Sequence, residues 1–264
     1  MTKYADKLNA HLTSYKEKSL GVTEKGTFRY RGEDIPYGHI LPRNEKWLSI
    51  MEPFRDEIRA YLRDRPKITL HQFFHHLNSS QAFALNLFYP YFAFEEAPIL
   101  LSAMDLDTSF SGWELEHVAD PTEGTNVDVA WWHAQQGGPK RWTYCEVKLT
   151  ERDFGTAADD ERHRKKLETI YRPVLESQVD PELLTRKRFF SRYQILRNIW
   201  LAARDARSRI VFLMPGGNTS LWEPLRSVLD GLSPGLRDRV HLVQTEQVVR
   251  RLAENGASSV QLAQ

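Results

Sequence analysis

The sequence predicts a mixed α/β fold in which a helical N-terminal region precedes a core built on a sheet. Residues 112–150 hold three short runs rich in Val, Trp, Tyr and Thr, separated by turn signals, and such runs predict strands. Helical periodicity dominates before and after these runs. The nearly all-apolar run 209–214 ends at a proline and two glycines, which predicts a strand buried on both faces. The order is therefore helix, three strands, helix, strand, with a mixed central sheet flanked by helices.

Composition limits the class of protein. The chain has 264 residues, of which 41% are hydrophobic and 27% charged, as in globular domains. No apolar run has the length of roughly 20 residues that a membrane helix needs, and the charged N-terminus does not resemble a secretion signal. We therefore expect a cytoplasmic location and no membrane partner. The one cysteine, Cys145, permits no internal disulfide.

Two domains are expected, an N-terminal mixed or helical extension over 1–66 and the core domain over 67–264. Apolar residues at helical spacing predict a helix over 47–63. Thr69 resembles an N-cap, which predicts a helix over the following residues, and Asn78-Ser79-Ser80 is a second helix start. Beyond the three strands, the same patterns predict the remaining elements in this order: helices from about 159, a strand over 209–214, a helix over 219–231, a strand over 239–243 and a helix over 245–254.

The charge of the chain is unevenly distributed. The net charge is +1, yet the stretch from Arg162 to Arg209 carries 13 Lys and Arg against 5 Asp and Glu. This local excess of positive charge is typical of a face that meets a polyanion, although solvated helix faces can be basic for no such reason. The expected contacts to a nucleic-acid backbone are Arg164, Lys165, Lys166, Arg192 and Arg197.

Three residues on two neighbouring strands form a candidate catalytic constellation. Side chains alternate along a strand, so Glu146 and Lys148 lie on one face and Cys145 on the other, as expected for a buried structural thiol. A hairpin places Asp128 across from Glu146 on the shared face. Burying these charges together is costly unless something neutralises them.

A divalent cation would neutralise this cluster. Carboxylate and carbonyl oxygens suit Mg²⁺, and Mn²⁺ can substitute, so the expected metal ligands are Asp128, Glu146 and the backbone carbonyl of Val147. Such a metal activates water and stabilises charge on a phosphate oxygen. Lys148 would position or deprotonate that water, or stabilise the transition state electrostatically. The chemistry predicted is metal-assisted phosphodiester hydrolysis.

Asp128 followed by Glu146-Val147-Lys148 resembles the signature of the PD-(D/E)xK nuclease superfamily, whose common core is α-β-β-β-α-β. A closer resemblance, over about 70–215, is to a group of bacterial restriction-endonuclease proteins. The segments that carry it are 78–82 running into 86–88, 145–151 with 153–155, and 193–198. The resemblance implies a restriction-endonuclease-like fold and a type II-like, Mg²⁺-dependent DNA endonuclease, in restriction and defence or in repair.

The resemblance also bears on single residues. It implies a role near the metal or the phosphate for Gln194, whose alternative is that of a boundary residue on a packed helix. The sequence departs from the family pattern because Val127 stands where many members have proline, and because the first core helix carries no acidic residue. Glu116 on the first strand, or Glu114, is the candidate replacement in a second metal site.

Three other interpretations stay open at this stage. The protein could be a catalytically inactive nucleic-acid-binding protein that keeps the nuclease-like fold. Glu146 and Lys148 could form only a structural salt bridge in an unrelated α/β domain. His71 and His75 are spaced to bind zinc, but no further ligand lies near them in the sequence, which favours ordinary histidines. The sequence excludes neither an RNA substrate nor a homodimer.

Overall fold

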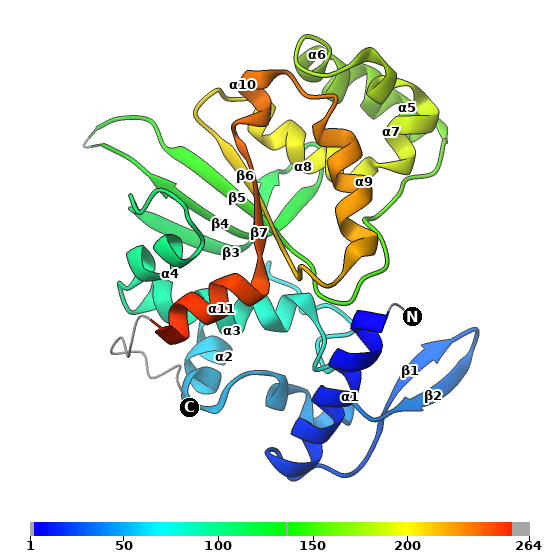
Figure 1. Cartoon of the computed structure of the whole chain (residues 1–264), viewed down its shortest axis with the longest axis vertical. Coiled ribbons are helices and arrows are strands. Elements are labelled where there is room, and N and C mark those ends of the chain that lie inside the picture. Colours follow the sequence, from blue (N-terminus) through cyan, green and yellow to red (C-terminus); the bar gives the residue numbers. More distant parts are fainter. Residues whose placement is uncertain (1–2, 136, 255–264) are drawn as a thin grey trace. The chain divides into compact units, whose positions relative to one another are not determined.

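The computed structural model describes residues 3–135 and 137–254, which divide into two compact units, 3–97 and 98–254 (Figure 1). The chain thus passes from one unit to the other at 97–98, and the domain boundary expected at residue 66 stays a prediction. The first unit contains α1 (Lys3–Lys18), β1 (Gly26–Tyr30), β2 (Glu33–Tyr37), the 3₁₀ turns η1 (Arg43–Ser49) and η2 (Glu52–Phe54), α2 (Arg55–Arg63) and α3 (Ser80–Ala93).

Helix α3 begins at the second of the two predicted start signals. The Ser79 side chain accepts a hydrogen bond from the Ala82 N–H, which caps the first turn. The prediction of a helix after Thr69 is wrong, because residues 69–79 form turns. Gln81 explains the difference: its side chain accepts from the His71 N–H at 2.8 Å and donates to the Thr69 carbonyl at 3.1 Å. A long-range partner therefore satisfies backbone groups that a helix would have used.

Three histidines lie buried in the first unit. His39, His75 and His76 keep at most 8% of their surface exposed. Burial, and in addition the neighbouring Lys16 ammonium, lowers the pKa of His39 to about 4, and burial together with His75 and His39 lowers the pKa of His76 to about 3. Both rings are therefore neutral in the folded protein at neutral pH. Among the described residues there is no group of three or more metal-ligating side chains, so His71 and His75 do not form the core of such a group.

We expect these histidines to make the first unit sensitive to acid. The pKa of His39 and of His76 is lower in the folded chain than the ordinary 6.5, so these rings take up protons more readily in the unfolded chain. The free energy of unfolding is therefore unaffected by them above pH 6.5 and decreases as the pH falls toward 4. Urea unfolding between pH 7 and pH 4.5 measures this loss. His76→Gln should flatten the pH dependence, whereas the same change at exposed His11 should not. Equal slopes for wild type and His76→Gln would contradict the assignment.

The second unit holds the predicted sheet. Its five strands are β3 (Gly112–Asp120), β4 (Thr125–His133), β5 (Arg141–Val147), β6 (Arg209–Met214) and β7 (Val240–Gln244). They lie in the order β3-β4-β5-β6-β7 (Figure 1). The first three pair antiparallel, and β6 and β7 add in parallel, so the predicted mixed sheet is confirmed.

The helices of the second unit flank this sheet. They are α4 (Ala97–Ala103), α5 (Glu161–Lys166), α6 (Arg172–Leu175), α7 (Arg186–Ser191), α8 (Tyr193–Ala203), α9 (Thr219–Leu229), α10 (Pro234–Arg237) and α11 (Thr245–Glu254), with a π-helical turn at Leu167–Tyr171 and a 3₁₀ turn at Pro181–Leu184. Helix α8 packs on β5 and β6, and α11 packs on β7. No helix in the described part of the chain combines the length and apolar character needed to span a bilayer.

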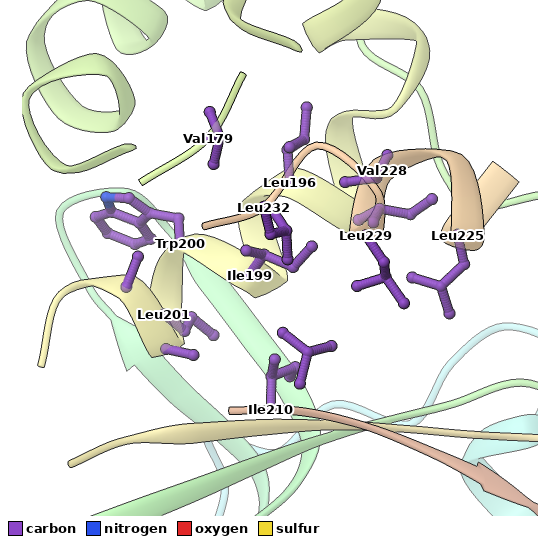
Figure 2. Close-up of a cluster of buried hydrophobic side chains, with 14 of the residues drawn as sticks. Val179, Leu196, Ile199, Trp200, Leu201, Ile210, Leu225, Val228, Leu229 and Leu232 are labelled. Atoms are coloured by element: carbon purple, nitrogen blue, oxygen red, sulfur yellow. The ribbon is translucent and has the colours of Figure 1, made fainter. Parts of the chain in front are cut away.

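The main core lies between the sheet and helices α8 and α9. Figure 2 shows Leu196 and Ile199 of α8 facing Val228 and Leu229 of α9, with Ile210 of β6 beneath them. Residues 210–214 of β6 are fully buried, as expected for a central parallel strand. This packing fixes α8 against the end of β5, where the charged residues lie.

Candidate active site

Glu146 lies at the centre of a cluster of polar side chains at the end of β5. Only 5% of the residue is exposed. Its Oε1 accepts hydrogen bonds from Lys148 Nζ at 2.9 Å and from Gln194 Nε2 at 2.7 Å. Its Oε2 accepts from Asn198 Nδ2 at 2.9 Å. Three donors therefore hold a buried carboxylate in one orientation, and the partners come from a strand and a helix far apart in the sequence.

The local sequence explains how these donors converge. Glu146 and Lys148 are two residues apart, so they share a face, and the Lys148 N–H donates to the Leu213 carbonyl of β6 at 2.9 Å. Gln194 and Asn198 lie one helical turn apart on α8 and both face Glu146. The structure thus brings together the predicted residues Glu146, Lys148 and Gln194 and adds Asn198.

A loop residue orients Gln194. The Gly155 N–H donates to Gln194 Oε1 at 2.8 Å, and the Gln194 N–H donates to the Gly155 carbonyl at 3.0 Å. With its oxygen held in this way, the amide must present its NH₂ group to Glu146. The helical region predicted from about residue 159 is interrupted here, because α7 ends at Ser191 and Arg192, with φ −123° and ψ 24°, leaves the helical conformation before α8 begins. That break sets the start of α8 beside the loop.

Asp128 lies next to Glu146, as the hairpin predicts. The β4–β5 ladder ends at the pair Val129–Cys145, and one residue further the Asp128 Oδ2 accepts from the Val147 N–H at 2.7 Å. Burial and the nearby carboxylates of Glu146 and Glu116 raise the pKa of Asp128 well above its ordinary value, against the opposing effects of Lys148 and the Val147 N–H. The site therefore concentrates negative charge.

Lys148 is the cation that offsets this charge. Burial alone would lower its pKa, but the carboxylates of Glu146, Glu151 and Asp128 outweigh burial and hold the pKa above its ordinary value. The side chain therefore stays protonated at neutral pH. Cys145 lies on the opposite face as predicted, fully buried, and burial raises the pKa of its thiol, which leaves it unreactive.

Glu116 occupies a strained position across from Asp128. It lies in β3 between the pairs Leu115–Val129 and His117–Val127, and its φ is +49°, in the left-handed region that a side chain rarely adopts within a strand. Glu114 and His117, which a regular strand would place on opposite faces, form a 2.6 Å hydrogen bond. The strain thus reorders side chains beside the site, and such strain is concentrated at functional positions.

A second buried carboxylate, Glu123, was not anticipated from the sequence. Lys166 Nζ, Tyr171 Oη and Tyr193 Oη all donate to its Oε1, at 2.9, 2.6 and 2.9 Å. Lys166 directly precedes the π-helical turn and Tyr171 is its last residue, and the wider spiral brings residues five apart to one face. Glu123 lies in a turn, and turn residues give no sequence signal of such a role. Because Tyr193 precedes Gln194, the cluster anchors the start of α8.

The predicted nucleic-acid contacts do not all lie free on the surface. Lys166 donates to Glu123, so its ammonium is engaged within the fold. Arg164 is exposed and pairs with Asp159, and Lys165 is exposed. Arg192 and Arg197 are partly buried. Their roles in binding stay predictions.

The residues present fit a hard divalent cation. Asp128 and Glu146 supply carboxylate oxygens, the ligand type that Mg²⁺ takes, usually from one or two carboxylates with water completing the shell. The raised pKa of Asp128 reflects its burial and the repulsion from Glu146 and Glu116, and a cation would relieve that repulsion. Asp128, Glu146 and the Val147 carbonyl are therefore the groups that would hold the metal, with Glu116 adjacent.

A mixed five-stranded sheet flanked by helices, with an acidic residue on one strand and Glu-Val-Lys at the end of the next, defines a restriction-endonuclease-like protein. Residues 9–264 match the family model described as "Restriction Endonuclease associating with ARP", and the chain belongs to this family. No curated protein and no solved structure matches the chain. The resemblance to restriction endonucleases is thereby confirmed over nearly the whole chain.

Proposed function

We propose that this protein is a Mg²⁺-dependent endonuclease that hydrolyses phosphodiester bonds in DNA, in restriction and defence or in repair. The observation that carries the proposal is the convergence of Asp128, Glu146 and Lys148 at one end of the sheet, in a chain of a restriction-endonuclease family. A structural salt bridge needs only Glu146 and Lys148. It does not explain why a third carboxyl group, Asp128, is buried beside Glu146, where burial and the Glu146 carboxylate raise its pKa.

Each residue has a role in this proposal. When bound by Asp128, Glu146 and the Val147 carbonyl, Mg²⁺ supplies an activated water and stabilises negative charge on the phosphate. The protonated Lys148 faces the same position and stabilises the charge that builds up as the water oxygen bonds to phosphorus and the P–O ester bond breaks. Its protonated state favours this electrostatic role over that of a base. Gln194 and Asn198 orient Glu146.

A cleavage time course on supercoiled plasmid tests the proposal. Wild type should nick or linearise the plasmid with Mg²⁺ or Mn²⁺ and not with EDTA, and Glu146→Ala should be inactive in all three conditions. Glu168→Ala is the matched control, because Glu168 is an exposed carboxylate whose ion pair among the described residues is with Arg172, four positions along the chain. Activity that survives in EDTA, or in Glu146→Ala, would overturn the proposal.

A folded wild type that binds DNA tightly without cleaving it would favour the inactive nucleic-acid-binding alternative. RNA substrates belong in the same assay, because the sequence does not exclude an RNA substrate. We also propose a cytoplasmic location. We propose a homodimer for a double-strand cut, because residues 3–135 and 137–254 of each chain form one such cluster. Sedimentation of the protein with and without DNA tests the dimer.

A further inference from the structure

A positively charged groove opens beside the candidate active site. It encloses about 850 Å³ between the loop that follows β5, helix α5 and helix α7. Arg164 contributes from α5, and Arg186 and Lys187 contribute from α7. Nothing in the sequence distinguishes Arg186 and Lys187 from the other basic residues of the stretch 162–209.

The charge of the groove is only partly balanced. Asp159 is the acidic residue in its lining, and it is engaged with Arg164, whose Nε donates to Asp159 Oδ1 at 2.6 Å and whose Nη2 donates to the Asp159 carbonyl at 2.9 Å. Arg186 and Lys187 are exposed, and they form no ion pair with any residue in the described part of the chain. The groove therefore presents two uncompensated cations, together with the Thr156 hydroxyl, to a ligand that carries negative charge.

The loop that follows Gly155 connects the groove to the residues around Glu146. Gly155, whose N–H holds Gln194, is followed directly by the groove residues Thr156 and Ala157. The Ala157 N–H donates to the Phe190 carbonyl at 2.9 Å, which joins the loop to α7. Two hydrogen bonds thus link Glu146 to the loop that lines the groove, one from Gln194 at 2.7 Å and one from Gly155 to Gln194 at 2.8 Å. The lining of the groove therefore begins one residue beyond the glycine that holds Gln194.

We infer that this groove binds the backbone phosphates of DNA on one side of the bond that is cut, with Arg186 and Lys187 as the principal contacts. The inference rests on the proposed function and adds the surface that positions the substrate. A repeating polyanion fits better than a single small anion, because the two cations are exposed along an open groove. Contacts to phosphates fix the register of the duplex without reading its sequence. Specificity therefore has to come from elsewhere in the molecule.

Salt-dependent DNA binding tests the inference separately from cleavage. The affinity of the full chain for a fluorescent DNA duplex is measured in EDTA at several KCl concentrations, for wild type and for Arg186→Gln/Lys187→Gln. Each phosphate contact contributes about 0.9 to the slope of log K against log salt, so the double variant should lose roughly 1.8 from the slope and about tenfold in affinity. With Mg²⁺, its KM for cleavage should rise while kcat is retained.

Two further variants make the test specific. Arg237→Gln/Arg250→Gln removes the same charge from exposed positions outside the groove and should keep the wild-type slope. Arg186→Lys/Lys187→Arg keeps the charge and should also bind as wild type does. The inference would be overturned if Arg186→Gln/Lys187→Gln kept the wild-type slope of log K against log salt. It would also be overturned if Arg237→Gln/Arg250→Gln lost as much of that slope as the groove variant does. If wild type itself does not bind DNA, the proposed function fails as well.

Discussion

Replacing Lys148 by methionine is expected to reduce DNA cleavage by about a thousandfold, while the folded chain still binds metal. A positioned charge in a transition state contributes on the order of 10²–10⁴ in rate. The carboxylates of Glu146 and Asp128 remain, and Gln194 and Asn198 still donate to Glu146. Cleavage kinetics measure the first effect, and isothermal titration with Mn²⁺ measures the second.

The same variant separates catalysis from structure. Removing one partner of a buried ion pair costs stability, so the melting temperature of Lys148→Met in EDTA should fall, and Mg²⁺ should raise it more than in wild type because the cation replaces the lost ammonium. Lys67→Met, at an exposed lysine, should match wild type in every measurement. A Lys148→Met protein that is unfolded with and without Mg²⁺ would support the structural salt bridge, and cleavage within tenfold of wild type would contradict the assigned role.

Asp128→Asn is expected to stabilise the protein in EDTA and to abolish cleavage. The pKa of Asp128 is raised by burial and by Glu146 and Glu116, so the charged carboxylate is unfavourable at neutral pH. Asparagine keeps an oxygen that can accept from the Val147 N–H and removes the repulsion, which for like charges on neighbouring strands is on the order of 1 kcal/mol. The gain corresponds to about 2–4 °C in Tm.

The pH dependence of this gain checks its cause. Because the folded-state pKa of Asp128 is raised, the destabilisation is absent below the ordinary pKa near 3.8 and grows as the pH rises. The difference in stability between Asp128→Asn and wild type should therefore be larger at pH 8 than at pH 5. A variant less stable than wild type in EDTA at pH 8 would show that Asp128 is held for the fold rather than for the metal.

The candidate site was predictable where strand alternation determines side-chain direction. The period of two along β5 placed Glu146 and Lys148 together and Cys145 behind them, and both placements are confirmed. The hairpin then placed Asp128 next to Glu146. The period of α8 placed Gln194 and Asn198 on one face, although only the fold shows that this face meets Glu146.

Contacts between distant segments were not predictable in the same way. Residues 69–79 have a helical pattern, but Gln81 satisfies their backbone in a turn instead. The cluster at Glu123 joins a turn, a π-helical segment and α8, and no local pattern relates these three. Lys166 and Arg186 belong to the same basic stretch, and only tertiary structure shows that the first is paired inside the fold and the second is exposed.

The left-handed backbone conformation of Glu116 in β3 also affects whether a strand of another chain can pair with the edge of the sheet. β3 is an edge strand, and a regular edge presents a row of backbone N–H and C=O groups that a foreign strand can extend, as in amyloid growth. The φ of +49° at Glu116 interrupts that row in the middle of the strand, and a register shift between Val118 and Asp120 disturbs its end. The distortion that shapes the surroundings of Asp128 thus also protects this edge from aggregation.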